Sequence, residues 1–154
     1  MTDARLKKLA DVLVNYSVNV QKGEWVGIRG DASALPALRA TYEAVLKAGG
    51  NPTLMMSDEF MTRAMLREGS EDQLDPNLQL FSEKADAQIT FISSNNTRAM
   101  TGIDSKRMQV AQRARMPLFQ NTMRRTAAGE YKWTLSLYPT DANAQEANMS
   151  LEEY

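Results

Sequence analysis

Apolar and polar residues repeat along this chain with two different periods, and these periods predict an order of helices and strands. Helical spacing of apolar side chains is found at 3–18, 34–48, 58–68, 77–84, 104–114, 117–129 and 141–148. Short apolar or alternating runs, typical of strands, occur at 24–29, 53–57, 87–93 and 131–137. The chain therefore alternates between helices and strands for most of its length.

Several local signals refine these boundaries. The first helix should bury one face made of Leu6, Leu9, Ala10, Leu13, Tyr16 and Ser17. Pro117 is expected to begin a new helix, because proline is tolerated in a first turn but disrupts a helix interior. The Ser70–Gln73 segment has a capping-box pattern, and Pro76 is expected to interrupt the helix that this pattern starts.

Alternating helices and strands with short connections are typical of βαβ units. We therefore predict an α/β fold, a three-layer α/β/α arrangement around a mostly parallel sheet of about four to five strands. The strand at 87–93 should be central. The helix at 58–68 should bury one apolar face, made of Phe60, Met61, Ala64 and Met65. Most of the 10 methionines are expected to fill gaps in the core.

Composition limits the class of protein. A chain of 154 residues with 43% hydrophobic residues suits one globular domain. Its 18 basic and 19 acidic residues give no basic surface for nucleic acid. No apolar run reaches the length of about 20 residues that spans a membrane, and the N-terminus has no apolar leader. The absence of cysteine favours a cytoplasmic location.

The chain contains no histidine and no cysteine. Serine–histidine and cysteine–histidine nucleophiles, zinc fingers and histidine-rich zinc sites are therefore excluded within it. Any chemistry of its own would require carboxylates, lysine, tyrosine, serine, threonine or a metal bound by oxygen ligands.

Two polar loops follow predicted strands and should lie at the carboxyl edge of the sheet, where ligands bind in open α/β folds. The candidate ligand contacts in these loops are Arg29, Asp31, Asn95, Asn96 and Arg98. A structural alternative holds for each loop. The first is a tight turn in which Asp31 or Ser33 caps the next helix, and the second is a solvated turn; both structural alternatives are favoured over ligand binding.

The chain ends on a pattern that begins a helix. Ser150 can cap it and Glu153, three residues later, can complete a capping box. Since a single helical turn is unstable in water, the helix is expected to continue. We therefore predict one α/β domain at 1–148, and the start of a connecting helix at 149–154.

Several segments, taken together, resemble a known family. They are Leu9–Ser17, Val20–Glu24, Ile28–Gly30, Trp133–Thr140 and Ala144–Tyr154. In this order they are similar to segments of the thermophilic-type metallo-aminopeptidases, the aminopeptidase S and T family. The similarity extends over the whole chain and covers the N-terminal α/β domain of such an enzyme.

The resemblance implies a peptide hydrolase that removes N-terminal residues with two divalent metals, zinc, cobalt or magnesium. Its metal ligands are glutamate, histidine and aspartate residues of a second, catalytic domain, and its members are homo-oligomers. No catalytic or metal-binding residue is therefore assigned to this chain, which is expected to be inactive alone.

The missing catalytic domain is the partner that the resemblance implies. Candidates for the domain junction are Trp133, Tyr138, Pro139 and Thr140, and internal packing is their alternative role. Two other functions stay open at this point: a stand-alone α/β module that binds a small ligand, and a module that binds another protein.

Overall fold

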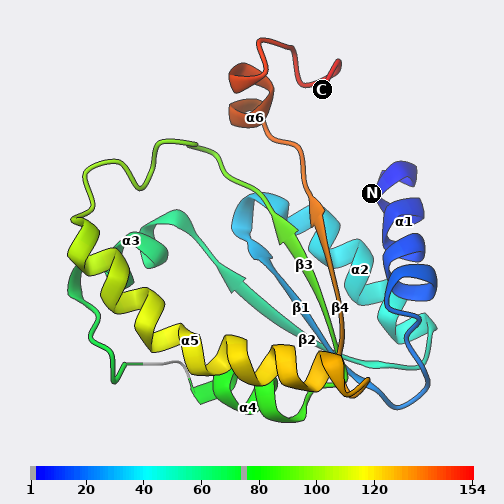
Figure 1. The fold of residues 1–154 in the computed structure, drawn as a ribbon. Coiled ribbons are helices and arrows are strands. Elements are labelled where there is room, and N and C mark those ends of the chain that lie inside the picture. The colour runs from blue at the N-terminus through cyan, green and yellow to red at the C-terminus, as the bar shows by residue number, and fades with distance from the viewer. Residues whose placement is uncertain (1–2, 74–75) are drawn as a thin grey trace.

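The computed structural model describes residues 3–73 and 76–154. Figure 1 shows the elements in chain order. They are α1 (Ala4–Asp11), the π-helix η1 (Val12–Ser17), β1 (Trp25–Asp31), the short 3-10 helix η2 (Ala32–Ala34), α2 (Leu35–Lys47), β2 (Asn51–Ser57), α3 (Glu59–Glu68), α4 (Pro76–Lys84), β3 (Ala87–Ile92), α5 (Ser105–Ala127), β4 (Lys132–Leu137) and α6 (Asp141–Glu146). None of the described helices has the length and apolar character needed to cross a membrane.

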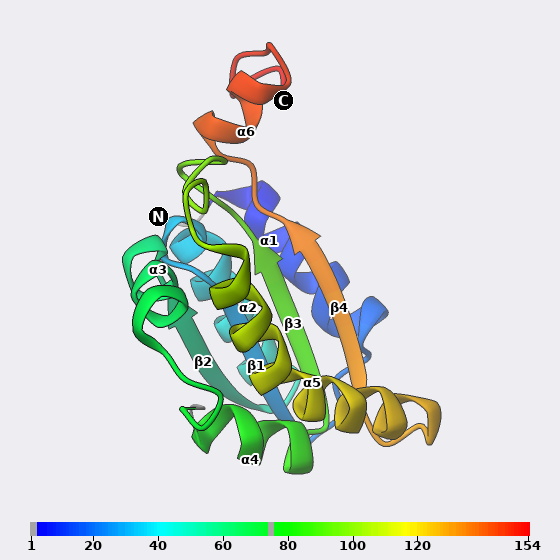
Figure 2. The same cartoon turned by 60° about the vertical axis from the view of Figure 1, so that its left-hand side comes forward.

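The strands form one parallel sheet in the order β2-β1-β3-β4. Helices α1 and α2 lie on one face, and α3, α4 and α5 lie on the other (Figures 1 and 2). The predicted three-layer α/β/α class and the central place of β3 are confirmed. The carboxyl ends of the strands all point to the same edge, where α6 also lies.

The face toward α1 and α2 carries the main core. Val26 and Ile28 of β1 and Ile89 of β3 are fully buried there, packed against the two helices and η1. Gly30 permits α2 to approach closely, because a Cβ at this position would lie 3.0 Å from Leu38 Cδ2. This face is therefore densely packed with aliphatic side chains.

The opposite face is covered mainly at one end. Phe81 of α4 lies directly over Gly27, where an added Cβ would overlap the phenyl ring, and its ring meets Trp25 edge to face at 5.0 Å between centroids. Helix α5 makes its main contacts with α4 and α3 instead of with the strands. The carboxyl half of this sheet face is consequently less covered than the amino half.

Helix α5 corrects the expected break at Pro117. It runs without interruption from Ser105 to Ala127, with Pro117 inside it. Proline removes one backbone hydrogen bond, to the carbonyl of Arg113. Both residues are exposed, so that carbonyl lies on the solvent side of the helix, where water can replace the lost donor.

The first helix differs from its predicted pattern at its end. Residues Val12–Ser17 form a π-helix, which has more residues per turn than an α-helix. The inward positions therefore shift: Val14 and Val18 are buried, whereas Tyr16, expected on the buried face, is 85% exposed and Ser17 is also exposed. Regular α-helical spacing could not reveal this change of phase.

Pro76 begins α4 instead of interrupting an earlier helix. One bond of the predicted capping box is present: the Ser70 N–H donates to Gln73 Oε1 at 3.0 Å. The Gln73 N–H donates to the Ser70 carbonyl at 3.2 Å. In the described residues this segment is only a turn. The helix expected to start there would run into residues 74–75, which lie outside the described part of the chain.

The expected burial of the apolar side of α3 is wrong. Phe60 is 78% exposed, Met61 60% and Met65 41%, and the helix has no buried residue. Other methionines, including Met56 and Met108, are likewise exposed. The pattern was amphipathic, but α3 sits at the edge of the less covered face and makes its main contacts with α5, which leaves these side chains exposed.

At the end of the chain, the predicted hydrogen bonds between Ser150 and Glu153 are present, but the residues that follow Ser150 form a turn. Helix α6 stops at Glu146, and Asn148 has a positive φ of 55°. The Ser150 N–H donates to Glu153 Oε2 at 3.0 Å, and the Glu153 N–H donates to Ser150 Oγ at 3.3 Å. Residues 151–153 form a turn.

Candidate functional site

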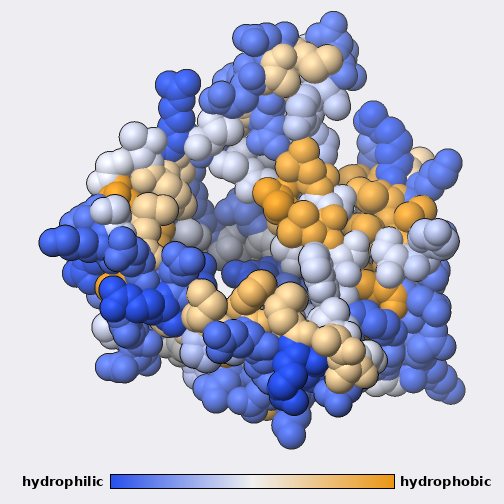
Figure 3. All heavy atoms as spheres, viewed as in Figure 1, coloured by the Kyte–Doolittle hydropathy of each residue, from blue (hydrophilic) through white to orange (hydrophobic). Residues whose placement is uncertain are grey.

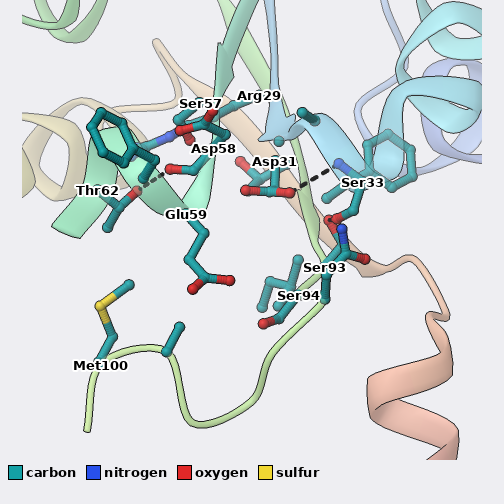
Figure 4. A pocket seen from close by; sticks show the side chains of 18 residues that line it. Arg29, Asp31, Ser33, Ser57, Asp58, Glu59, Thr62, Ser93, Ser94 and Met100 are labelled. Atoms are coloured by element: carbon teal, nitrogen blue, oxygen red, sulfur yellow. Dashed lines mark hydrogen bonds between the residues drawn. The ribbon is translucent and has the colours of Figure 1, made fainter. Parts of the chain in front are cut away.

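A cavity of about 610 Å³ opens at the carboxyl edge of the sheet (Figure 4). Its walls come from the ends of β1, β2 and β3, from the first turn of α3, and from the loop after β3. The polar residues that line it are Arg29, Asp31, Ser33, Ser57, Asp58, Glu59, Thr62, Thr90, Ser93, Ser94 and Asn95. The two loops predicted to converge at this edge do lie together.

A hydrogen bond joins the two loops directly. The Ser33 and Ser93 hydroxyl oxygens lie 2.8 Å apart, although the residues are 60 positions apart in the chain. The Asp31 carboxylate accepts from the Ser33 N–H at 2.9 Å, so Asp31 caps η2. The Ser33 N–H is a backbone donor that could otherwise bind an anionic ligand, and Asp31 occupies it.

The third wall is built around the start of α3. The Asp58 carboxylate accepts from the Met61 N–H at 2.7 Å. The backbone carbonyl of Asp58 accepts from the Thr62 hydroxyl at 2.9 Å. Glu59 follows in the first turn and lies 3.8 Å from Arg63. The positive end of the helix is thus already matched by the carboxylates of its own chain. The rim of the cavity favours polar or cationic groups over anions.

Arg29 brings a positive charge to the lining of the cavity. Burial lowers the pKa of its guanidinium, and the nearby positive charge of Arg115 lowers it further. Among the described residues, no hydrogen bond or ion pair is found for the Arg29 side chain. A half-buried cation without a partner is energetically unfavourable, so this residue needs a further explanation.

The other predicted ligand contacts divide into two groups. Asn95 lines the cavity, whereas Asn96 and Arg98 do not. Asn96 Oδ1 instead accepts from the Arg98 N–H at 3.0 Å. The Arg98 side chain is 82% exposed and lies 3.8 Å from Glu146 of α6. These two residues shape the loop and its contact with α6.

Sequence reasoning missed the contribution of β2. Ser57, Asp58 and Thr62 line the cavity, and they follow a strand in the same way as Asp31 and Ser93. The signal was present, because the carboxyl ends of neighbouring parallel strands meet at one edge. In the sequence, Asp58 and Glu59 also suit the first turn of the helix predicted at 58–68, and this role explains them without a ligand.

The four junction candidates lie in different environments. Trp133 is 52% exposed on β4, and Pro139 is exposed. Tyr138 is half-buried against the main core. Thr140 is buried; its hydroxyl donates to the Ser94 carbonyl at 2.6 Å and accepts from the Asn143 N–H at 3.3 Å. Thr140 thus caps α6 and ties it to the loop after β3.

The donor set of the chain does not fit a pair of catalytic metals. Within residues 3–73 and 76–154, no three histidine, cysteine, aspartate or glutamate side chains come together in a way that could hold a metal ion. The whole sequence has no histidine or cysteine. The carboxylates around the cavity are used as caps and ion pairs, so no metal-dependent step is assigned to these residues.

Comparison with known proteins finds a matching family and similar solved structures. The profile of the family described as "Thermophilic metalloprotease (M29)" matches residues 2–154. The structure of wild-type AmpT from Thermus thermophilus has a similar fold, with a TM-score of 0.74 and 21% sequence identity. The alignment covers 96% of this chain and 40% of that protein, so this chain spans less than half of its structural relative. No curated protein matches.

Proposed function

This chain belongs to the M29 family of thermophilic metalloproteases, and from this premise we propose that it is the N-terminal α/β domain of a metallo-aminopeptidase. In the proposed enzyme, the domain supports a separate catalytic domain that removes N-terminal residues from peptides. Residues 1–148 would form this domain, and residues 149–154 would begin the connection to the catalytic part.

The observation that carries the proposal is the match of a metallopeptidase family to nearly the whole of a chain that has no metal-ligating cluster in its described residues. A two-metal hydrolase needs several ligands that hold both ions and activate a water molecule. Two divalent ions, with zinc, cobalt and magnesium as candidates, would therefore be bound outside this chain. The 40% coverage of AmpT is consistent with such a division.

The domain would form one wall of the active-site cavity and a surface that contacts the catalytic domain. The exposed Trp133 and Pro139 are the proposed contacts with the catalytic domain, whereas Tyr138 and Thr140 would hold the β4–α6 connection in place from inside. Peptide as substrate and a homo-oligomeric assembly are further parts of the proposal for the complete enzyme. A cytoplasmic location stays a prediction from the cysteine-free sequence.

An activity assay tests the proposal. The purified 154-residue chain is incubated with leucine p-nitroanilide and with zinc, cobalt or magnesium, each with and without EDTA. We expect no hydrolysis that depends on metal and is abolished by EDTA. Such hydrolysis, if it co-purified with the folded chain, would show that the metal site lies within these residues. The proposal that a separate catalytic domain holds the metals would then be wrong.

The genomic sequence after the codon for Tyr154 gives an independent test. The proposal predicts an open reading frame that continues and encodes glutamate, histidine and aspartate residues for a metal site. A stop codon directly after Tyr154 would contradict the connecting role proposed for residues 149–154.

A further inference from the structure

A second cavity, of about 420 Å³, lies between the less covered face of the sheet and helices α4 and α5. Figure 3, viewed as Figure 1, shows a hollow beside α5, with hydrophobic side chains gathered near it. Much of its wall is apolar, made by Leu78, Phe81, Leu118, Phe119, Met123, Trp133 and Leu135. Two arginines, Arg29 and Arg115, also line it, and no carboxylate does.

The register of the strands explains how a charge comes to lie on this face. Arg29 pairs with Met55 of β2 and with Thr90 of β3, and Thr90 pairs with Leu135 of β4. These four side chains form a row across the sheet on one face. In a sheet covered on both faces such a row is normally aliphatic. Here the two central positions of the row hold the cationic Arg29 and the polar Thr90.

Neither arginine is neutralised by the rest of the described chain. No hydrogen bond or ion pair is found for the side chain of Arg29 or Arg115. Arg125 nearby is different: its guanidinium donates to the Ser82 carbonyl at 3.1 Å and to the Glu130 carbonyl at 3.2 Å. The fold therefore satisfies one arginine at this end of α5 and leaves two others directed to the cavity.

The polar floor of the cavity is held in position. Tyr131 donates its hydroxyl to Gln88 Oε1 at 2.9 Å, and Gln88 Nε2 donates to Thr90 Oγ1 at 2.8 Å. This chain of bonds fixes Thr90 beside Arg29 in the same row of the sheet. The apolar wall includes Trp133, which is 52% exposed, and Phe119, which is 59% exposed. Both ring systems are available for contact with a ligand.

We propose that this cavity binds a small carboxylate that carries an apolar body. Arg29 and Arg115 would bind the carboxylate, because the guanidinium group matches the two oxygens of a carboxylate in a bidentate geometry. The apolar body would lie against Trp133, Phe119 and Leu135. The volume suits a small molecule. The inference rests on the cavity in the 154-residue chain by itself; Trp133 is the one residue that it shares with the proposed domain junction.

Calorimetric titration with N-acetyl-L-phenylalanine tests the inference. The amide of the same compound is the matched control ligand, since it has the same body and no charge. We expect saturable binding of the carboxylate with a change in tryptophan fluorescence, and no binding of the amide in the same range. Arg115→Gln and Arg29→Gln should each weaken binding at least about tenfold, the effect of losing a hydrogen bond to a charged group.

Arg113→Gln is the matched control variant. Arg113 lies on the same helix, is 65% exposed, and is held 3.3 Å from Glu71; it does not line this cavity. Its substitution should leave binding unchanged. If Arg29→Gln failed to fold, Arg115→Gln would decide alone, because Arg115 is exposed on α5 and its loss should leave the fold intact.

Three results would overturn the inference. They are the absence of saturable carboxylate binding to the folded chain, equal binding of the amide, and equal weakening by Arg113→Gln. Self-association that is abolished by Trp133→Ser, in a chain that binds no carboxylate, would assign the same face to a protein contact instead.

Discussion

The two faces of the sheet are built from the same strands but differ in almost every physical respect. On β1, Val26 and Ile28 point to the α1/α2 face and are fully buried. Gly27 and Arg29, between and beside them, point to the other face, where Arg29 is half-buried and unpaired within the described chain. One face excludes water, and the other keeps a cavity and a charge.

The difference lies in where the aliphatic core is built. The α1/α2 face alone supplies an aliphatic core, whereas the opposite layer is fixed mainly through Phe81 of α4. Charged and polar groups that cost stability are retained where a fold has another task. We infer that the first face holds the domain together and that the second serves recognition.

The largest effect expected from this comparison is on the packed face. Ile28→Ala should lower the free energy of unfolding by about 2–5 kcal/mol, because it leaves a cavity in a core that cannot collapse around it. Leu135→Ala, on the other face, removes a side chain that is 51% exposed and should cost less than about 1 kcal/mol. Urea unfolding of both variants checks this. Similar losses would remove the distinction between the faces.

A second expected effect concerns the one place where the less covered face is tight. In Gly27→Val, the added side chain would collide with the Phe81 ring and displace α4, at a cost of about 1–3 kcal/mol. If the collision is the cause, the loss in the double variant with Phe81→Ala should be smaller than the sum of the two single losses. Strictly additive losses in the double variant would argue against the contact as the cause.

A smaller effect should appear at alkaline pH. Burial raises the pKa of Tyr131, and the positive charges of Arg125 and Arg29 oppose the shift only in part. The folded state therefore keeps a proton that the unfolded chain loses near its ordinary pKa of about 10. The contribution of Tyr131 to the free energy of unfolding is fully present below that pH. It decreases as the pH rises above it.

Tyr131→Phe isolates this contribution. At neutral pH the variant should lose about 0.5–1.5 kcal/mol, because Gln88 loses a hydrogen-bond donor. Between about pH 9 and 11 its unfolding free energy should fall less than that of the unchanged protein. An identical decline in both proteins would show that Tyr131 does not titrate differently on unfolding.

Much of the fold followed from the sequence, because the strands are short apolar runs and the helices between them are amphipathic. The parallel sheet and the meeting of two polar loops at its edge were predicted correctly. The π-helical end of the first helix was not, since Val14 and Val18 become inward positions only after a change of phase. Helix α5 continued through Pro117 because solvent can satisfy the carbonyl that proline leaves free.

The cavities were harder to predict. Arg29 was a candidate because it ends a strand, but the second cavity requires knowledge of how far α5 stands from the sheet. The exposure of Phe60 and Met61 was likewise not predicted. Periodicity identifies which face of a helix is apolar; it does not say whether another element covers that face.

The free energy of unfolding of Arg29→Met, measured with urea, tests whether the less covered face is kept for recognition. If the less covered face is kept for recognition, removing its unpaired charge should leave stability unchanged or raise it, by up to about 1 kcal/mol. A loss of more than about 1 kcal/mol, the size expected when a stabilising interaction is removed, would show that Arg29 supports the fold. The proposed division between the two faces would then be wrong.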